Sequence, residues 1–195
     1  NIMIALYAFV VISFFITIVD IIIRFPLQSE MIDYNDIQAI VINVLALLIQ
    51  IVFFAYGFVN AIRGMLSPKR MGAVIVAFFA ATCITGTGNM VINSNVQIVL
   101  WWIVLIIPNV VGAVATFAYF VSGKKSKIYS IIIYLAAIWG MFRIIYSNYN
   151  LIVHANQYLS MNSTVRLVLG IAIHCLVIYQ TYVLWIKRQN AIDIS

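Results

Sequence analysis

Charged side chains are scarce in this chain, which has five acidic and eleven basic residues among 195, or 8% in total. Average soluble domains carry about 25% charged residues. Hydrophobic residues make up 65% of the sequence, and a soluble protein of this size could not bury so much apolar surface. The composition therefore excludes a soluble domain and predicts a polytopic membrane protein.

Signatures of catalysis and of metal binding are also missing. The sequence has no H-E-x-x-H, no G-x-S-x-G, no C-x-x-C and no lysine deep in an apolar run that could hold a retinal. The two cysteines, Cys83 and Cys175, lie in separate apolar runs and do not have the close spacing of a metal site. Haem bound between His154 and His174 is disfavoured, because His154 falls in a predicted loop and His174 lies deep in an apolar run. We therefore expect neither an enzyme, nor a metal, nor a cofactor.

Six apolar runs are long enough to cross a membrane, since about 20 apolar residues span the hydrocarbon core as a helix. Barrel strands would instead read as roughly ten-residue alternating segments. The first run exceeds the apolar core of a secretion signal, so we expect it to be a membrane span. We predict an all-α bundle in a single domain, 1–195, with spans at about 1–23, 37–62, 72–90, 96–121, 128–146 and 165–186.

Three features should shape these spans locally. Pro26 is expected to end the first span. The segment 82–89 is rich in threonine and glycine and is expected to unwind the end of the third span. Pro108, in the middle of the fourth span, should kink it because proline removes one backbone hydrogen bond.

Basic residues in the short loops predict the orientation. Arg24, Arg143 and Arg166 fall toward one side, and the other eight basic residues fall on the opposite side, in alternate loops and after the last span. Basic loops stay in the cytoplasm, so we expect both termini to be cytoplasmic. The positive charge is thus explained by membrane orientation, and we expect no nucleic-acid partner. The predicted location is a plasma or bacterial inner membrane, and the inner membrane of an organelle fits as well.

Small and polar residues mark two helix faces. Asn43, Gln50, Gly57 and Gly64 repeat every seven residues and share one face of the second span. Amides in hydrocarbon are costly without partners, so this face should meet protein or water. On the third span, alanines at 73, 77 and 81 recur every four residues, and such a stripe permits close helix packing. We expect another membrane subunit to bind at this Ala73/Ala77/Ala81 face.

Two groups of residues are candidates for binding a ligand. The first lies in the predicted outer leaflet, where Asp20 would pair with Arg143 or both would meet a small polar or anionic solute, with Trp139 nearby. The second lies at mid-membrane and consists of Asn43, Gln50, Asn109 and His174. For both groups the alternative is structural: an ion pair or a snorkelling arginine in the first, and hydrogen bonds between helices in the second.

In helix number, predicted topology and mass, the chain resembles the substrate-binding subunits of energy-coupling-factor vitamin importers. This resemblance implies capture of a small molecule from the outer side and docking of a partner through small-residue faces. Ala5 and Ala8 depart from the family's A-x-x-x-A pattern on the first span. We therefore expect a small-solute binding or transport subunit with an outward-facing pocket. The alternative is a non-catalytic structural or accessory subunit of a larger respiratory, secretion or immunity complex.

Overall fold

The computed structural model describes residues 2–28, 34–92, 100, 102–124, 126–147 and 161–192, and within them the chain is helical and contains no strand. Six helices in this part of the chain are long and apolar enough to cross a membrane, which confirms the number of spans predicted. The segments are α1 (Ile2–Gln28), α2 (Tyr34–Ile62), α3 (Pro68–Ile92), the π-helical η2 (Trp102–Ile106), α5 (Ile107–Thr116), the π-helical η3 (Phe117–Val121), α6 (Lys127–Ser147) and α9 (Met161–Ile192).

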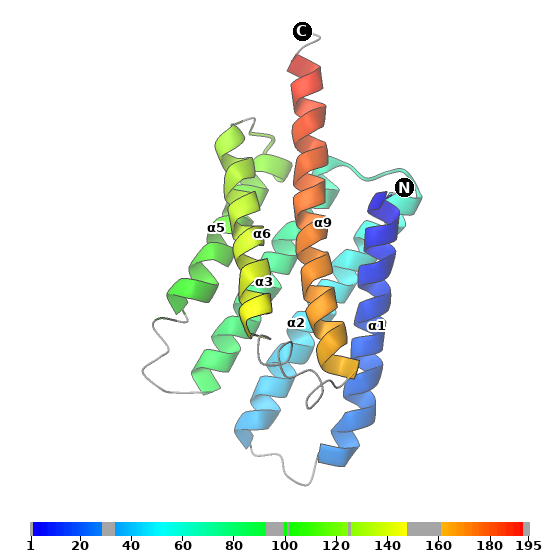
Figure 1. The fold of residues 1–195 in the computed structure, drawn as a ribbon, viewed down its shortest axis with the longest axis vertical. Coiled ribbons are helices and arrows are strands. Elements are labelled where there is room, and N and C mark those ends of the chain that lie inside the picture. The colour runs from blue at the N-terminus through cyan, green and yellow to red at the C-terminus, as the bar shows by residue number, and fades with distance from the viewer. Residues whose placement is uncertain are drawn as a thin grey trace.

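The helices form two layers of three. In Figure 1, α9 stands between α6 and α1 in the nearer layer, and α3 stands between α5 and α2 behind it. The layers join at their edges, where α1 packs on α2 and α6 packs on α5. Half of the apolar span is buried in α3 and in α9, against 17% in α2. The middle helix of each layer therefore carries the core, and the four corner helices keep broad apolar faces outside.

Aromatic side chains fill the space between the layers. Tyr7, Phe14 and Phe54 lie at the α1–α2 edge, and the Phe14 and Phe54 ring centroids are 5.7 Å apart. Phe79 and Tyr119 are buried near the α3–η3 contact. The aromatic residues of the first three spans therefore divide between core and surface, because Phe15 of α1 is exposed whereas the adjacent Phe14 is buried.

Two arginines close the turns at one end of the bundle. After α2, Gly64 adopts a positive φ of 66°, and the Arg70 guanidinium donates to the Asn60 side chain at 2.8 Å and to the Met65 carbonyl at 2.6 Å. After η3, Arg188 donates to the carbonyl of Tyr119 at 2.6 Å. Cations favour helix C-termini, where carbonyls lack helical partners. These arginines therefore cap helices at the end of the bundle that carries the basic turns, which we name the basic end.

Both chain ends lie at this basic end, together with the α2–α3 and η3–α6 turns (Figure 1). The side chain of Phe120 packs where a Cβ on Gly72 would come within 2.5 Å, which brings the two turns together. The predicted grouping of the termini with the basic turns is therefore confirmed. Their placement in the cytoplasm stays a prediction.

Two expected helix ends were wrong. Helix α1 continues through Pro26 to Gln28, and proline removes only one hydrogen bond so close to the end. Helix α3 continues through the glycine–threonine segment to Ile92. The hydroxyls of Thr82 and Thr85 donate to carbonyls four residues earlier, at 2.9 and 3.1 Å. These bonds absorb the polar side chains without unwinding the helix.

The alanine stripe of α3 faces the chain's own helices. Ala77 is 6% exposed and Ala81 is fully buried, whereas Ala73 is half-buried. Small side chains allow backbones to approach closely, and α3 packs closely on α2 and α5. The face that we expected to bind another subunit is thus largely covered within the chain at Ala77 and Ala81, and a partner at this face stays a prediction.

Candidate functional site

The structure does not bring the seven predicted ligand-binding residues together. Asn43 and Gln50 lie on α2, where Asn43 is exposed and Gln50 is half-buried. Trp139 and Arg143 lie on α6, at the diagonally opposite corner of the two layers. The side chain of Asp20 lies outside the described residues, and so does its predicted pair with Arg143. Among the described residues, the two candidates on α2 and the two on α6 therefore lie in separate parts of the bundle.

Trp139 donates a hydrogen bond to the backbone of the fourth span. Its indole Nε1–H donates to the carbonyl of Val104 at 2.8 Å. In an α-helix that carbonyl would receive the N–H of the residue at position 108, which is proline and has none. The chain is π-helical over η2, immediately before Pro108. Trp139 thus supplies the Val104 carbonyl with the hydrogen-bond donor that Pro108 lacks, and this bond joins α6 to the fourth span.

Asn109 is also used within its own helix. Its Nδ2 donates to the carbonyl of Leu105 at 2.6 Å, one turn earlier. An amide that bonds locally needs no partner from another helix or from a ligand. This bond fits the structural alternative for the mid-membrane amide next to the proline, and its role in ligand binding stays a prediction.

His174 is enclosed between α3 and α6. Its Nδ1 lies 2.7 Å from the carbonyl of Gly170, so that nitrogen carries the proton and Nε2 is left as an acceptor. Its ring meets Phe78 edge-on, with centroids 5.0 Å apart. Nε2 faces Gly140, where an added Cβ would lie only 2.1 Å away. The imidazole therefore occupies the space that glycine leaves on α6, and this contact fixes the spacing of α6 and α9.

Arg143 lies one turn beyond Gly140 and is half-buried. Its charge is close enough to act on His174. Every acidic side chain of this protein lies outside the described part of the chain, so no carboxylate partner for Arg143 can be named there. The ligand-binding roles predicted for the outer group, Asp20, Arg143 and Trp139, therefore stay predictions.

A buried polar pair that we did not predict ties three helices together. Nε2 of Gln180 on α9 donates to the hydroxyl of Tyr7 on α1 at 2.5 Å, and both side chains are fully buried. The Tyr7 ring lies against Gly57 of α2, where a Cβ would come within 2.4 Å. Gly57 belongs to the face of the second span that we expected to meet protein or water, and here it meets the Tyr7 ring. The Gln180 Oε1 is buried without a hydrogen-bond partner among the described residues.

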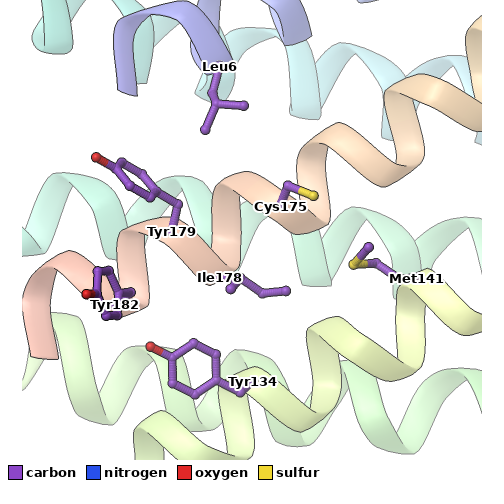
Figure 2. Close-up of a pocket in the computed structure, with 7 residues that line it drawn as sticks. All are labelled: Leu6, Tyr134, Met141, Cys175, Ile178, Tyr179 and Tyr182. Carbon is purple, nitrogen blue, oxygen red and sulfur yellow. The ribbon is translucent and has the colours of Figure 1, made fainter. Parts of the chain in front are cut away.

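A cavity of about 530 Å³ lies on the side of the bundle, over α9 and between α1 and α6. It is open toward the surroundings rather than enclosed. Figure 2 shows the side chains that line it, which come from these three helices: Leu6, Tyr134, Met141, Cys175, Ile178, Tyr179 and Tyr182. We name this feature the α9 groove. None of the seven predicted residues lines it.

One pattern in the sequence belongs to the α9 groove but could not identify it. Residues 175, 178, 179 and 182 recur at helical spacing and form one face of α9, but apolar faces of that kind occur on all six spans. The groove exists because α1 and α6 flank α9 without closing over this face, which only the packing decides. Within the described residues, no group of three histidine, cysteine or acidic side chains could hold a metal ion.

Comparisons with protein-family models, with curated proteins and with solved structures found no match to this chain. The resemblance to vitamin-importer subunits therefore still rests on size and helix number alone. The function has to be argued from the geometry.

Proposed function

We propose that this protein is an integral membrane binding subunit that holds a small amphipathic molecule in the α9 groove. The observation that carries this proposal is the groove itself. Its volume of about 530 Å³ lies within the 300–1,000 Å³ typical of small-molecule sites. Its lining combines aliphatic side chains with three tyrosines, which offer apolar rings and hydroxyl groups.

The route into this site differs from the outward-facing pocket that the sequence favoured. The α9 groove opens on the side of the bundle, between two helices whose exposed faces are apolar. If the six spans cross a membrane, the opening faces lipid rather than water. The ligand would therefore enter from within the bilayer, which favours molecules that partition there. The lining side chains support binding and positioning, not catalysis.

A variant that fills the groove tests this function. Cys175→Phe adds a ring to the half-buried floor of the groove, and Val114→Phe adds the same ring on an exposed face of α5. After gentle detergent extraction, mass spectrometry of the organic extract should find a molecule retained by the wild type and by Val114→Phe. Cys175→Phe should have lost it. Equal retention by all three proteins would refute the proposal.

The proposed orientation has its own test. We propose that the protein lies in a plasma or bacterial inner membrane and that its basic end faces the cytoplasm. Ser126 and Thr164 are exposed at opposite ends of the bundle. A cysteine at Ser126 should resist an impermeant thiol reagent added to intact cells, whereas one at Thr164 should react. The reverse pattern would invert the topology.

The second candidate is an accessory subunit of a larger membrane complex. Only 17% of the α2 span is buried within the chain, so most of this helix is available to other subunits. Native mass spectrometry of the extracted protein distinguishes the candidates. A stoichiometric partner chain that is lost when α2 carries bulky substitutions would support the accessory role. A single chain with a retained small molecule would support the binding role.

A further inference from the structure

The α9 groove has a polar end and an apolar end. Figure 2 shows the hydroxyls of all three tyrosines on the side of their rings nearer the C-terminal end of α9, whereas Met141 and Cys175 lie toward the other end. Tyr134 and Tyr182 are close enough to interact electrostatically. Among the described residues, none of the three hydroxyls has a hydrogen-bond partner. The groove therefore offers donors at one end and only apolar contacts at the other.

The polar end continues into the basic end of the bundle. Lys127, Tyr134 and Met141 are seven residues apart on α6, so they lie along one face at intervals of about 10 Å. Lys127 is exposed and lies at the end of this face nearest the basic end of the bundle. Lys187, near the end of α9, is exposed at the same end of the bundle. Along the groove the surface thus changes from basic, to phenolic, to apolar.

This order matches the chemistry of a phospholipid. A lipid presents a charged phosphate, then ester oxygens that accept hydrogen bonds, then an acyl chain. A transmembrane helix matches it less well, because its carbonyls are already bonded within the helix. Hydroxyls in hydrocarbon are costly without partners, so an occupant with acceptor oxygens at tyrosine depth is favoured. Phosphate near the lysine adds attraction between opposite charges.

We propose that the occupant of the α9 groove is an anionic membrane phospholipid. Its acyl chain lies against Leu6, Met141 and Cys175, its ester oxygens accept from the tyrosine hydroxyls, and its phosphate lies within reach of Lys127. This inference rests on the binding function proposed above and adds the class of ligand and its direction in the groove.

The test compares two lipids and three variants. Purified protein in detergent is titrated with phosphatidylglycerol and with phosphatidylcholine of the same acyl chains, and bound lipid is counted by native mass spectrometry. Lys127→Gln removes the charge at the groove, and Lys69→Gln removes an equally exposed charge on α3, in the other layer. Cys175→Phe fills the groove. Both lysine changes are at exposed positions, so folding should be preserved.

The wild type should bind phosphatidylglycerol more tightly than phosphatidylcholine. Lys127→Gln should weaken phosphatidylglycerol binding about fivefold, the value of one basic residue near an anionic lipid, and weaken phosphatidylcholine binding less, because choline offsets the charge of its phosphate. Lys69→Gln should change neither, and Cys175→Phe should abolish both. Equal binding of the two lipids, lost only in Cys175→Phe, would overturn the anionic preference and keep the binding function. Lipid binding that survives Cys175→Phe, or a partner chain displaced by it, would overturn both proposals.

Discussion

The region around Trp139 and His174 lies on one side of α6, and the α9 groove lies on the other. The two differ in whether their polar side chains are hydrogen-bonded within the fold. In the first region the indole of Trp139 and the imidazole of His174 bind backbone carbonyls, and the imidazole also fills space left by Gly140. In the groove the three tyrosine hydroxyls have no partner among the described residues. The comparison teaches that polar residues in an apolar span can complete the fold, while the open site forms where packing leaves a face uncovered.

The largest expected effect on stability comes from adding a side chain at Gly140. In Gly140→Leu the new side chain would overlap His174, since even a Cβ would lie 2.1 Å from Nε2. Overpacking of this kind costs about 1–3 kcal/mol of unfolding free energy. The measurement is thermal unfolding in detergent, with Leu135→Phe on the exposed face of α6 as a control. His174→Ala should rescue Gly140→Leu, and an absence of rescue would mean that the two residues do not share this space.

The next effect concerns the buried pair of Tyr7 and Gln180. Tyr7→Phe leaves the whole Gln180 amide without its partner, which should cost about 1–3 kcal/mol. Replacing both partners with apolar groups of similar shape can be nearly neutral, so Tyr7→Phe with Gln180→Met should recover most of the loss. Denaturant unfolding of the two single variants and the double variant gives the coupling energy. Additive losses would contradict the direct bond.

A smaller effect should follow the loss of the Trp139 indole. Trp139→Phe leaves the Val104 carbonyl without that donor, and one hydrogen bond contributes about 0.5–1.5 kcal/mol. Pro108→Ala restores a backbone N–H that could reach the same carbonyl. In the Pro108→Ala background, Trp139→Phe should therefore cost measurably less. The same cost in both backgrounds would separate the tryptophan from the proline and weaken our account of this region.

The smallest change in stability should come from the groove. Tyr179→Phe removes a hydroxyl that has no described partner, so the free energy of unfolding should change by less than about 0.5 kcal/mol. Retention of the bound molecule should nevertheless fall. The pair of measurements separates a binding residue from a structural one. A clear loss of stability without any loss of binding would place Tyr179 in the fold.

The helices could be predicted from the sequence because membrane spans follow from length and apolarity alone. Six helices of the described residues are long and apolar enough to be the predicted spans, and Gly57, on the face expected to meet protein or water, lies against the Tyr7 ring. Helix ends were less predictable, because the effects of Pro26 and of the glycines before Ile92 depend on hydrogen bonds that a residue list does not show. In α3, hydrogen bonds from threonine hydroxyls to carbonyls of the same helix accompany a helix that continues where we expected it to unwind.

The candidate site was harder to predict, for a physical reason. Asn109 and His174 stand out in the sequence because they are polar, yet each bonds to the helix that carries it. The α9 groove is lined by residue types that occur on every span, such as leucine, isoleucine and tyrosine. Its existence depends on how far apart α1 and α6 stand, which is a property of the packing.

Alkylation of Cys175 tests most directly that the α9 groove, and not the region around Trp139 and His174, is the binding site. In a Cys83→Ala background, N-ethylmaleimide would add its bulk to the groove wall at Cys175. We predict that the adduct displaces the retained molecule, that the occupied protein reacts more slowly than the emptied one, and that Trp139→Phe retains the molecule, as does Asn109→Ala at the other polar position of the fourth span. Retention by the alkylated protein, with loss in Trp139→Phe or Asn109→Ala, would contradict the account.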